Sequence, residues 1–460
     1  MATAATGAPT ITSSPTIAQG IEPIPLDQRR LSGFDLAILW GDLGVGLLVL
    51  QAGALLSPGL GARDALGAIV VGSVIGVLLL GLAAYVAADA GVPTMVLTRA
   101  AVGIRGSALP TILNVIQLVG WTSFEILVMA QFANAIVEHL TGLSAYPLWA
   151  LVFTVLCTAM AFGGPLVVVR QWLEKFGVWA MLATSIALVA LLVTRFDLSA
   201  ILATPGTGEL SFWLGVDIVV ALPISWFPLV ADYNRFARSR SASFWGTFVG
   251  YLLANIAFFG LGLLYVIALN TDVAHLNDEL VGFLGGSALL GGLALLIILA
   301  DETDEGFADI YSAAVSTQNL LSRVPQRALI AAYATIGFVL AIVLANADYE
   351  WFLLLIGSFF IPLLGVILAD YFVARGRYVA DELFAEAGRY WYQGGVNALA
   401  VAAWLVGFLV YQWIAPPAAL THALGEAFSP LASPIGATIP SFAIAFALYA
   451  VVGRTVTHRG

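Results

Sequence analysis

Long apolar runs separated by short polar breaks organise the whole chain. A hydrocarbon layer about 30 Å thick needs about 20 apolar residues for each helical crossing. Twelve stretches meet that length, and they centre approximately on residues 33–57, 65–88, 111–136, 147–168, 176–194, 213–234, 244–269, 283–312, 328–345, 351–373, 395–414 and 436–453. The pattern therefore predicts an all-α membrane protein with twelve transmembrane helices.

The termini and the few basic side chains orient these helices. Residues 1–28 are rich in Ala, Thr, Ser and Pro and lack the pattern of a signal peptide, which predicts a disordered cytoplasmic tail. With the N-terminus inside, only Arg63 and Arg195 among the 18 lysines and arginines fall in outer loops. Because basic residues resist translocation, this bias predicts that both termini are cytoplasmic in a multi-pass protein of the plasma membrane.

Composition excludes several classes of function. The 460 residues are 60% hydrophobic and 10% charged, whereas an ordinary soluble domain has about 25% charged residues. A net charge of −10 excludes a nucleic-acid partner, which would need a basic face. The single cysteine, Cys157, excludes a disulfide framework and a thiolate metal cluster, and four scattered histidines show no zinc pattern.

Helix breakers mark two of the predicted helices. The first contains four glycines between Gly41 and Gly53, and the sixth contains Pro223 and Pro228. These breaks lie about 180 residues apart, as expected for two inverted repeats of a secondary transporter. We predict a first repeat over 29–194, a second over 195–377, and two C-terminal helices with a short tail over 378–460. The alternative is that Gly and Pro are simply common in membrane helices.

The third predicted helix carries polar residues at helical spacing: Asn114, Gln117, Trp121 and Glu125 share one face. An ionisable group in mid-membrane is costly, so Glu125 is expected to face a cavity or a partner. A carboxyl group beside an indole suits a flat heterocycle, which stacks on the indole and donates N–H groups to the acid. Alternatively, Glu125 bonds a neighbouring helix and Trp121 only packs.

The eighth predicted helix carries a stripe of acids, in which Asp301, Glu305, Asp309 and Ser312 recur at helical spacing. Carboxylates stacked without a nearby basic residue call for a bound cation or bound protons. Oxygen ligands favour a hard ion over a transition metal. The alternative is that these acids are solvated in a cytoplasmic extension of the helix.

The sixth helix is predicted to unwind around Pro223 to Pro228, which exposes backbone groups to a ligand and places Trp226 within the break. Asp217 and Asp232 bracket this region. Asp232 precedes Arg235 at the predicted cytoplasmic end, where a solvated ion pair is expected.

Four stretches of the chain resemble the nucleobase:cation symporter-1 family of cytosine, purine, allantoin and hydantoin permeases. They are GVPTMVLTRAAVGIRGS after the second helix, LNVIQLVGWTSFEI on the third, ISWFPLVADYNRFAR on the sixth and ADIYSAAVSTQNLL on the eighth. The resemblance spans about residues 30–375. It implies a leucine-transporter-like fold of two five-helix inverted repeats plus two C-terminal helices. SWFPLVADY looks most similar to the cytosine and hydroxymethylpyrimidine branch.

The residue patterns and the resemblance together predict two groups of site residues. The substrate-binding group is Trp121, Glu125, Gln117, Ser225, Trp226, Asp309 and Gly46. The cation-binding group is Asp42, Val45, Ala300, Thr303 and Asp304, with Na⁺ as the metal ion. Two positions depart from the family pattern: Pro223 stands where a tryptophan usually completes an aromatic sandwich, and Asp304 stands where a hydroxyl is usual.

Together these features predict a transporter rather than an enzyme. It imports a nucleobase or related aminopyrimidine, such as cytosine, a purine or hydroxymethylpyrimidine, by symport with Na⁺ or H⁺. It needs no organic cofactor, and its expected partners are this small heterocycle and membrane lipid. An amino-acid or polyamine symporter on the same fold is the alternative. A membrane enzyme is disfavoured because no loop exceeds about 25 residues, and a channel because broken helices build an occluded site.

Overall fold

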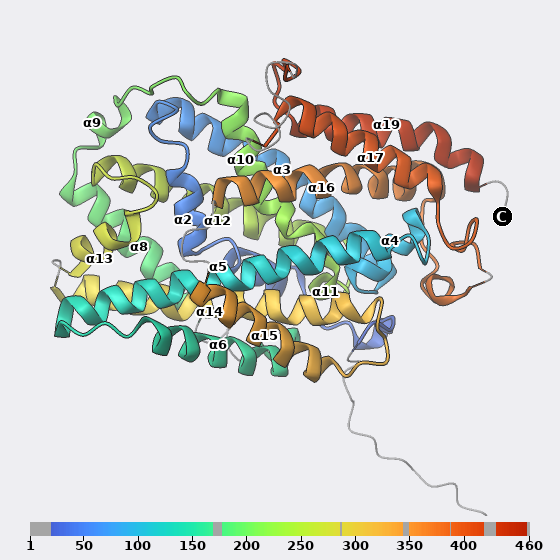
Figure 1. Ribbon diagram of the computed structural model, residues 1–460, viewed down its shortest axis with the longest axis horizontal. Helices are drawn as coiled ribbons and strands as arrows, with labels where there is room; N and C mark the ends of the chain where they lie inside the picture. The colour runs from blue at the N-terminus through green and yellow to red at the C-terminus, as the bar shows by residue number, and fades with distance from the viewer. Residues whose placement is uncertain are drawn as a thin grey trace, which may run out of the picture.

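The computed structural model describes residues 20–168, 177–285, 288–343, 349–386, 388–417 and 429–457. Helices run along one long axis (Figure 1), and the described residues form no β-strand, only two isolated bridges. The longer helices are α3 (Ala62–Ala90), α5 (Ala108–Thr141), α6 (Tyr146–Gly163), α8 (Val178–Arg195), α10 (Phe212–Ser225), α12 (Arg240–Ala268), α14 (Ala288–Gln318), α15 (Gln326–Val343), α16 (Tyr349–Ala369), α17 (Ala398–Ile414) and α19 (Thr438–Thr457).

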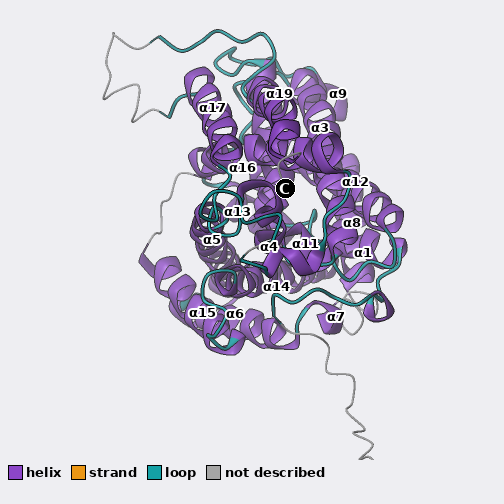
Figure 2. Ribbon diagram, turned by 90° about the vertical axis from the view of Figure 1, so that its right-hand side faces the viewer, coloured by secondary structure: helices purple, strands orange, loops and turns teal. Residues whose placement is uncertain are grey.

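Shorter elements connect or complete these helices: η1 (Leu26–Gln28), α1 (Gly33–Asp42), α2 (Leu47–Ala54), α4 (Thr94–Val102), α7 (Pro165–Val167), α9 (Leu198–Leu202), η3 (Phe227–Leu229), α11 (Val230–Asn234), α13 (Leu276–Gly285), η4 (Asp370–Arg375) and η5 (Ala380–Phe384). Viewed along the bundle axis, α17 and α19 lie at one edge and α6 and α15 at the opposite edge (Figure 2). The helices that line the central cavity lie between these two edges.

Seven of the described helices are long and apolar enough to cross a membrane, and the bent pair α1 and α2 adds an eighth span if counted as one. The apolar stretches Leu182–Arg195, Ala398–Ile414 and Thr438–Val451 are shorter. Each of the twelve predicted ranges overlaps a helix or a broken helix of the structure. The all-helical, multi-pass architecture is confirmed, whereas the count of twelve crossings stays a prediction.

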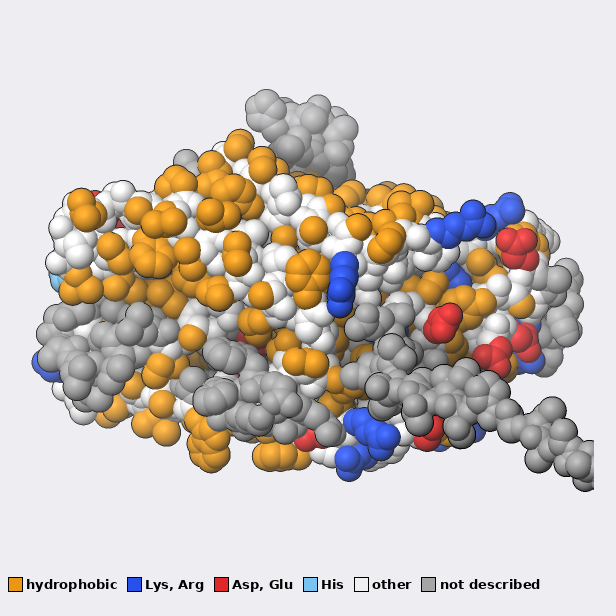
Figure 3. Space-filling view, turned by 90° about the horizontal axis from the view of Figure 1, so that it is seen from below, with side chains coloured by type: hydrophobic (Ala, Val, Ile, Leu, Met, Phe, Trp, Pro, Cys, Tyr) orange, Lys and Arg blue, Asp and Glu red, His pale blue; other side chains and the backbone are white. Residues whose placement is uncertain are grey.

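The outer surface is apolar where lipid is expected. Large side chains such as Leu151, Val155, Ile186, Leu253 and Val451 are exposed. Hydrophobic side chains cover much of the face in Figure 3, and its charged side chains are concentrated in the right half. A soluble protein rarely exposes so extensive an apolar surface, so lipid contact explains this distribution.

We call the end of the bundle that carries Arg99, Arg105 and Arg375 the basic end. The opposite end carries Arg63, at the start of α3, and Arg195, at the end of α8. The basic residues of the predicted inner loops and those of the predicted outer loops therefore lie at opposite ends of the bundle. The basic end is the one predicted to face the cytoplasm.

The break in the first membrane helix lies where the glycines predict it. α1 ends at Asp42 and α2 begins at Leu47, and the two helices meet at a bend of 61°. At Gly44, an added Cβ would lie 2.8 Å from the Cβ of Ala254 on α12. The glycine therefore allows α12 to approach the broken segment.

The sixth membrane helix breaks within the segment predicted, between Pro223 and Pro228, starting at Trp226. Pro223 lies inside α10, which continues to Ser225 before a short 3-10 turn leads into α11. The freed carbonyl of Ser225 accepts a hydrogen bond from Gln117 Nε2 at 3.1 Å, and that of Pro228 accepts one from Asn114 Nδ2 at 3.3 Å. Side chains of the third membrane helix therefore satisfy the backbone groups that the break exposes.

Part of the predicted disordered tail is packed against the bundle. Ile24 is buried, and its amide donates to Gly91 O at 2.8 Å, just after α3. Arg235 Nη1 donates to Gly20 O at 2.7 Å, which holds the segment against the basic end. Residues 20–28 thus differ from the expectation for 1–28, and residues 1–19 lie outside the described part of the chain.

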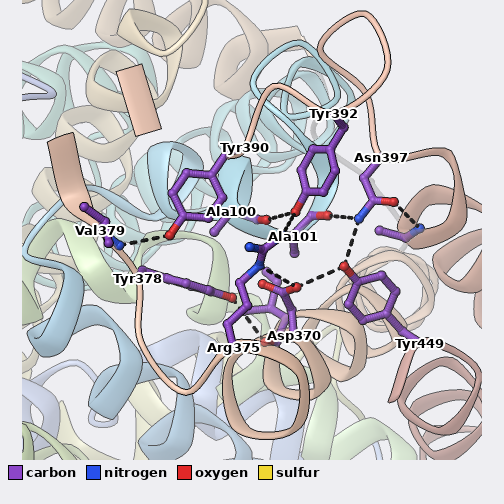
Figure 4. Close-up of polar contacts among 12 residues, drawn as sticks. Ala100, Ala101, Asp370, Arg375, Tyr378, Val379, Tyr390, Tyr392, Asn397 and Tyr449 are labelled. Carbon is purple, nitrogen blue, oxygen red and sulfur yellow. Dashed lines mark hydrogen bonds and ion pairs between the residues drawn. The ribbon is translucent and has the colours of Figure 1, made fainter. Parts of the chain in front are cut away.

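A buried polar network at the basic end joins α16 to the C-terminal helices (Figure 4). The Asp370 carboxylate pairs with Arg375 Nε at 3.2 Å and accepts a hydrogen bond from Tyr449 OH at 2.9 Å. Asn397 Nδ2 donates to Tyr449 OH and to Ala101 O, each at 2.8 Å. These bonds also satisfy a terminal carbonyl of α4, which no partner within that helix reaches.

At the opposite end, Asp217 of α10 binds the start of α19. Its carboxylate accepts the backbone amides of Ala437 at 2.7 Å and Thr438 at 3.0 Å. A carboxylate at a helix N-terminus satisfies unpaired amides and interacts favourably with the helix dipole. α19 is consequently bonded to α10 at one end and, through Tyr449, to η4 near the other.

Candidate functional site

A small buried cavity lies between the break of the first membrane helix, α5, the end of α10 and α14. Its volume is about 20 Å³, and it is lined by Leu43, Leu48, Val49, Trp121, Glu125, Leu222, Ser225, Trp226, Leu229, Glu305 and Asp309. The structure thus brings Trp121, Glu125, Ser225, Trp226 and Asp309 of the predicted substrate group together. A void of this size holds about one water molecule.

The two tryptophans reach the cavity from different helices. Trp121 projects from α5, and its indole N–H is buried with no hydrogen-bond partner among the described residues. Trp226 caps α10 and meets Trp40 edge-on, at 6.0 Å between ring centroids and an interplanar angle of 89°. Both rings line the cavity, so its walls combine π faces with carboxyl groups.

Gln117, predicted to bind substrate, instead positions the surrounding helices. Its amide nitrogen donates to Asn114 Oδ1 at 2.8 Å and to Ser225 O at 3.1 Å. Asn114 Nδ2 in turn donates to Ser316 Oγ on α14 at 2.8 Å. These bonds link α5, α10 and α14 beside the cavity, and Gln117 does not line it.

Three glutamates form a compact acidic cluster beside the cavity. Carboxylate oxygens of Glu125, Glu302 and Glu305 lie within 4.8 Å of one another, and all three side chains are buried. Glu302 was not foreseen from the sequence, because the stripe was counted from Asp301, whose side chain lies outside the described part of the structure. The signal was present, since Glu302 is three residues before Glu305.

The unwound first helix lies directly against this cluster. Leu47 N, at the start of α2, donates to Glu302 Oε2 at 2.7 Å. At Gly46 an added Cβ would lie 2.8 Å from Glu305 Oε1 and 3.2 Å from Glu302 Oε2. Gly46, predicted as a substrate residue, therefore provides the space that the two carboxyl groups occupy.

Two of the predicted cation-binding residues, Asp42 and Asp304, interact electrostatically across the site, and they are 1% and 2% exposed. Val45 is buried beside them and donates its amide to Asp42 O at 2.9 Å. Thr303 Oγ1 donates to Ala300 O at 2.7 Å within α14. The arrangement offers oxygen ligands only, which suits a hard cation such as Na⁺.

The alternative that the acids of the eighth helix are solvated is wrong. Glu302, Asp304, Glu305 and Asp309 are each at most 4% exposed. Burial of four acids in one helix needs compensating interactions, because isolated charges are costly in a dry interior. α14 therefore carries its acids into the bundle rather than into water.

The predicted solvated ion pair of Asp232 and Arg235 is also wrong. Asp232 is 1% exposed and accepts the amide of Thr94 at 3.0 Å, at the start of α4. Arg235 is fully buried and donates to Gly20 O and Tyr311 OH. Both side chains bind segments distant in sequence, which a local pattern of charges does not reveal.

An aromatic cluster covers the cavity toward the opposite end: Trp121, Phe124, Tyr349 and Phe352, with ring centroids 5.1–6.4 Å apart. Tyr349 OH donates to Leu48 O at 3.0 Å, which joins α16 to α2. Beyond the cluster lies a wider cavity of about 730 Å³, lined partly by Phe124, Tyr349 and Glu138. Phe352 was missed because an aromatic residue within an apolar run gives no contrast, and Tyr349 because it lies between two acids just before the predicted run 351–373.

Broken membrane helices around a buried polar cavity, closed from a wider vestibule by aromatic side chains, define a membrane transport protein. The sequence pattern of the family described as "Permease for cytosine/purines, uracil, thiamine, allantoin" matches residues 23–428. The chain belongs to this family, the nucleobase-cation-symport-1 permeases. It is accordingly a permease and not an enzyme.

Individual relatives span most of the chain. The putative purine-cytosine permease YxlA of Bacillus subtilis is 25% identical over 85% of this chain and 86% of its own length. The hydantoin permease of Microbacterium maritypicum is 23% identical over 84% and 82%. The cytosine permease of Escherichia coli K12 is 26% identical over 82% and 85%.

Solved structures show the same fold. Mhp1, a nucleobase-cation-symport-1 family transporter in a closed conformation with bromovinylhydantoin bound, superposes with a TM-score of 0.80 at 21% identity, covering 96% of each chain. A Na⁺-coupled sialic acid symporter gives a TM-score of 0.64 at 13% identity, covering 93% of this chain and 90% of its own. The leucine-transporter-like fold expected from the sequence is confirmed.

Proposed function

We propose that this permease imports a nucleobase or related aminopyrimidine across the plasma membrane, coupled to Na⁺ or H⁺, by alternating access. The observation that carries the proposal is the buried cavity in which Trp121 and Trp226 meet the carboxyl groups of Glu125 and Asp309. A flat ring packs against the indoles, while its N–H groups donate to the acids. In this proposal the chain crosses the membrane twelve times as two inverted repeats and two C-terminal helices, with both termini cytoplasmic.

The shape of the cavity supports alternating access. The cavity has room for about one water molecule, so a flat ring enters only when the walls separate. The vestibule beyond the aromatic cluster gives a route from the opposite end. We infer that movement of Tyr349 away from Leu48 admits substrate, and that closure excludes water from the site.

Chemistry of the acceptors favours particular bases. A carboxylate accepts hydrogen bonds from an exocyclic amino group, such as that of cytosine, adenine, guanine or hydroxymethylpyrimidine, and neutral guanine also places a ring N–H beside its amino group. Uracil presents a carbonyl on each side of its N3–H group, and each carbonyl would face a buried acid. We therefore expect the site to prefer amino-substituted bases to uracil.

Coupling is proposed at Asp42, Val45, Ala300, Thr303 and Asp304. An ion at this position would bridge the broken first helix to α14, both of which border the substrate cavity. Ion binding therefore would order the same helices that hold substrate. By linkage, substrate must then tighten ion binding by the same factor.

The test uses purified protein and a panel of cytosine, adenine, guanine, uracil, allantoin and hydroxymethylpyrimidine. Binding is measured by tryptophan fluorescence with and without Na⁺ at two pH values. We expect an amino-substituted base to bind and one cation to tighten it. Binding of no heterocycle under any condition, with amino acids or polyamines bound instead, would refute the proposal.

A further inference from the structure

The substrate cavity is strongly acidic. Glu125, Glu305 and Asp309 line it, and Glu302 lies in contact range of the first two. No arginine, lysine or histidine is among the lining residues. The two fully or nearly buried arginines of the neighbouring helices, Arg99 and Arg235, are bonded to other groups at the basic end.

The acceptors of this cavity are not saturated by the protein. Glu125 Oε2, Glu302 Oε1 and Glu305 Oε1 are buried and have no hydrogen-bond partner among the described residues. A buried acceptor without a donor is unfavourable. A ligand with several N–H donors would satisfy these oxygens, whereas a ring rich in carbonyl groups would add acceptors to a site that already has too many.

The aromatic walls also favour positive charge. Trp121 and Trp226 both line the cavity, and the face of an indole attracts cations more strongly than that of any other side chain. A dry site strengthens this attraction because water does not screen it. Carboxylates at the edge of a ring and indoles at its faces therefore both favour a positively charged ligand.

We propose that the preferred substrate is a flat heteroaromatic cation with adjacent N–H donors, of the aminopyrimidinium or aminoimidazolium type, rather than a neutral base. The inference rests on the proposed function and specifies the substrate class of that site. One positive charge offsets part of the buried negative charge, and each N–H group donates to a carboxyl oxygen. Trp121 and Trp226 contact the faces of the charged ring.

A matched pair of small probes separates charge from shape. 2-Aminoimidazole is a planar cation with guanidinium-like N–H groups at pH 7, and imidazol-2-one is its neutral carbonyl counterpart. We expect the cation to bind the purified permease at least about tenfold more tightly, as charge-assisted hydrogen bonds are roughly twice as strong as neutral ones. Calorimetry and tryptophan quenching both measure this ratio.

Two variants locate the effect. Glu305→Gln should clearly lower the binding ratio of the two probes, because it removes one charge from the cavity wall. Glu138→Gln is the matched control, since Glu138 lies on α5 beside the wider vestibule and not in the cavity. If Glu305→Gln fails to fold, Asp309→Asn makes the same test from the same wall.

The outcomes distinguish this inference from the proposed function. Cation preference that is clearly lowered in Glu305→Gln and kept in Glu138→Gln supports it. Tight cytosine binding together with no preference for 2-aminoimidazole over imidazol-2-one would overturn the inference and leave the proposed function standing. Tight Mn²⁺ or Ca²⁺ binding that Glu305→Gln abolishes, without cation preference among the probes, would assign the carboxyl groups to a metal and also overturn it.

Discussion

Replacement of Glu125 by Gln is the sharpest test of the site. The side chain is 2% exposed and lines the cavity, and its Oε2 has no partner among the described residues. Gln keeps the size of the side chain and one carbonyl acceptor, so the fold should tolerate the change. What it loses is the charge and the second acceptor.

The expected loss of affinity follows from hydrogen-bond strengths. A bond to a charged group contributes about 1.5–3 kcal/mol and a neutral one about 0.5–1.5 kcal/mol, so Glu125→Gln should cost about 1–2 kcal/mol of binding free energy. This corresponds to a dissociation constant roughly 5- to 30-fold higher for cytosine or a related aminopyrimidine. Melting temperature should change little, because none of the described backbone groups bonds to the carboxylate.

Uptake into cells and quenching in detergent should both report this loss, after uptake is normalised to the amount of protein in the membrane. Glu138→Gln serves as the control, because it makes the same chemical change on α5 beside the vestibule. Unchanged affinity and uptake in Glu125→Gln would refute the role of this carboxyl group in binding. Equal losses in both variants would point to a general effect of charge instead.

Three further changes test other parts of the structure. Gly46→Ala places a Cβ 2.8 Å from a buried glutamate oxygen, so substrate binding should fall at least about tenfold. The control is Gly282→Ala, which has open space around it and should leave binding unchanged in the same assay. Tyr349→Phe removes one neutral hydrogen bond of about 1 kcal/mol, so stopped-flow measurements should show substrate leaving about fivefold faster; an unchanged rate would contradict a closing role. Asp370→Asn leaves buried Arg375 without its ion partner and should destabilise the fold by up to about 3–5 kcal/mol, seen as a lower melting temperature.

Much of the fold could be predicted because membrane physics leaves strong marks on a sequence. Each crossing needs a long apolar run, and the loops between runs carry the charges, so the predicted ranges overlap the helices of the structure. The break between α1 and α2 was visible because glycines cluster there. The sixth-helix break begins at Trp226, within the predicted segment, although Pro223 itself is accommodated inside α10.

Only part of the site could be predicted from the sequence, and the reason is physical. Polar residues stand out within apolar runs, which is why Trp121, Glu125 and Asp309 were found, and the cavity brings them together. Tyr349 lies between two acids just outside the predicted apolar run, and its contact with Leu48 joins segments about 300 residues apart. Glu302 belongs to the acidic cluster although the predicted stripe begins at Asp301, the residue next to it in the sequence.

The two attachments of α19 restrict how the transporter can move. A helix of 20 residues is about 30 Å long and behaves as a nearly rigid rod. Asp217 attaches one end to α10, and Tyr449 attaches the other region to the junction of α16 and η4. The two attachment points, Thr438 and Tyr449, lie eleven residues apart, about 17 Å along the rod, so α19 holds α10 and the start of η4 at a fixed separation. Conformational change should therefore be confined to the aromatic-cluster half of α16, with the helix bending near Pro362.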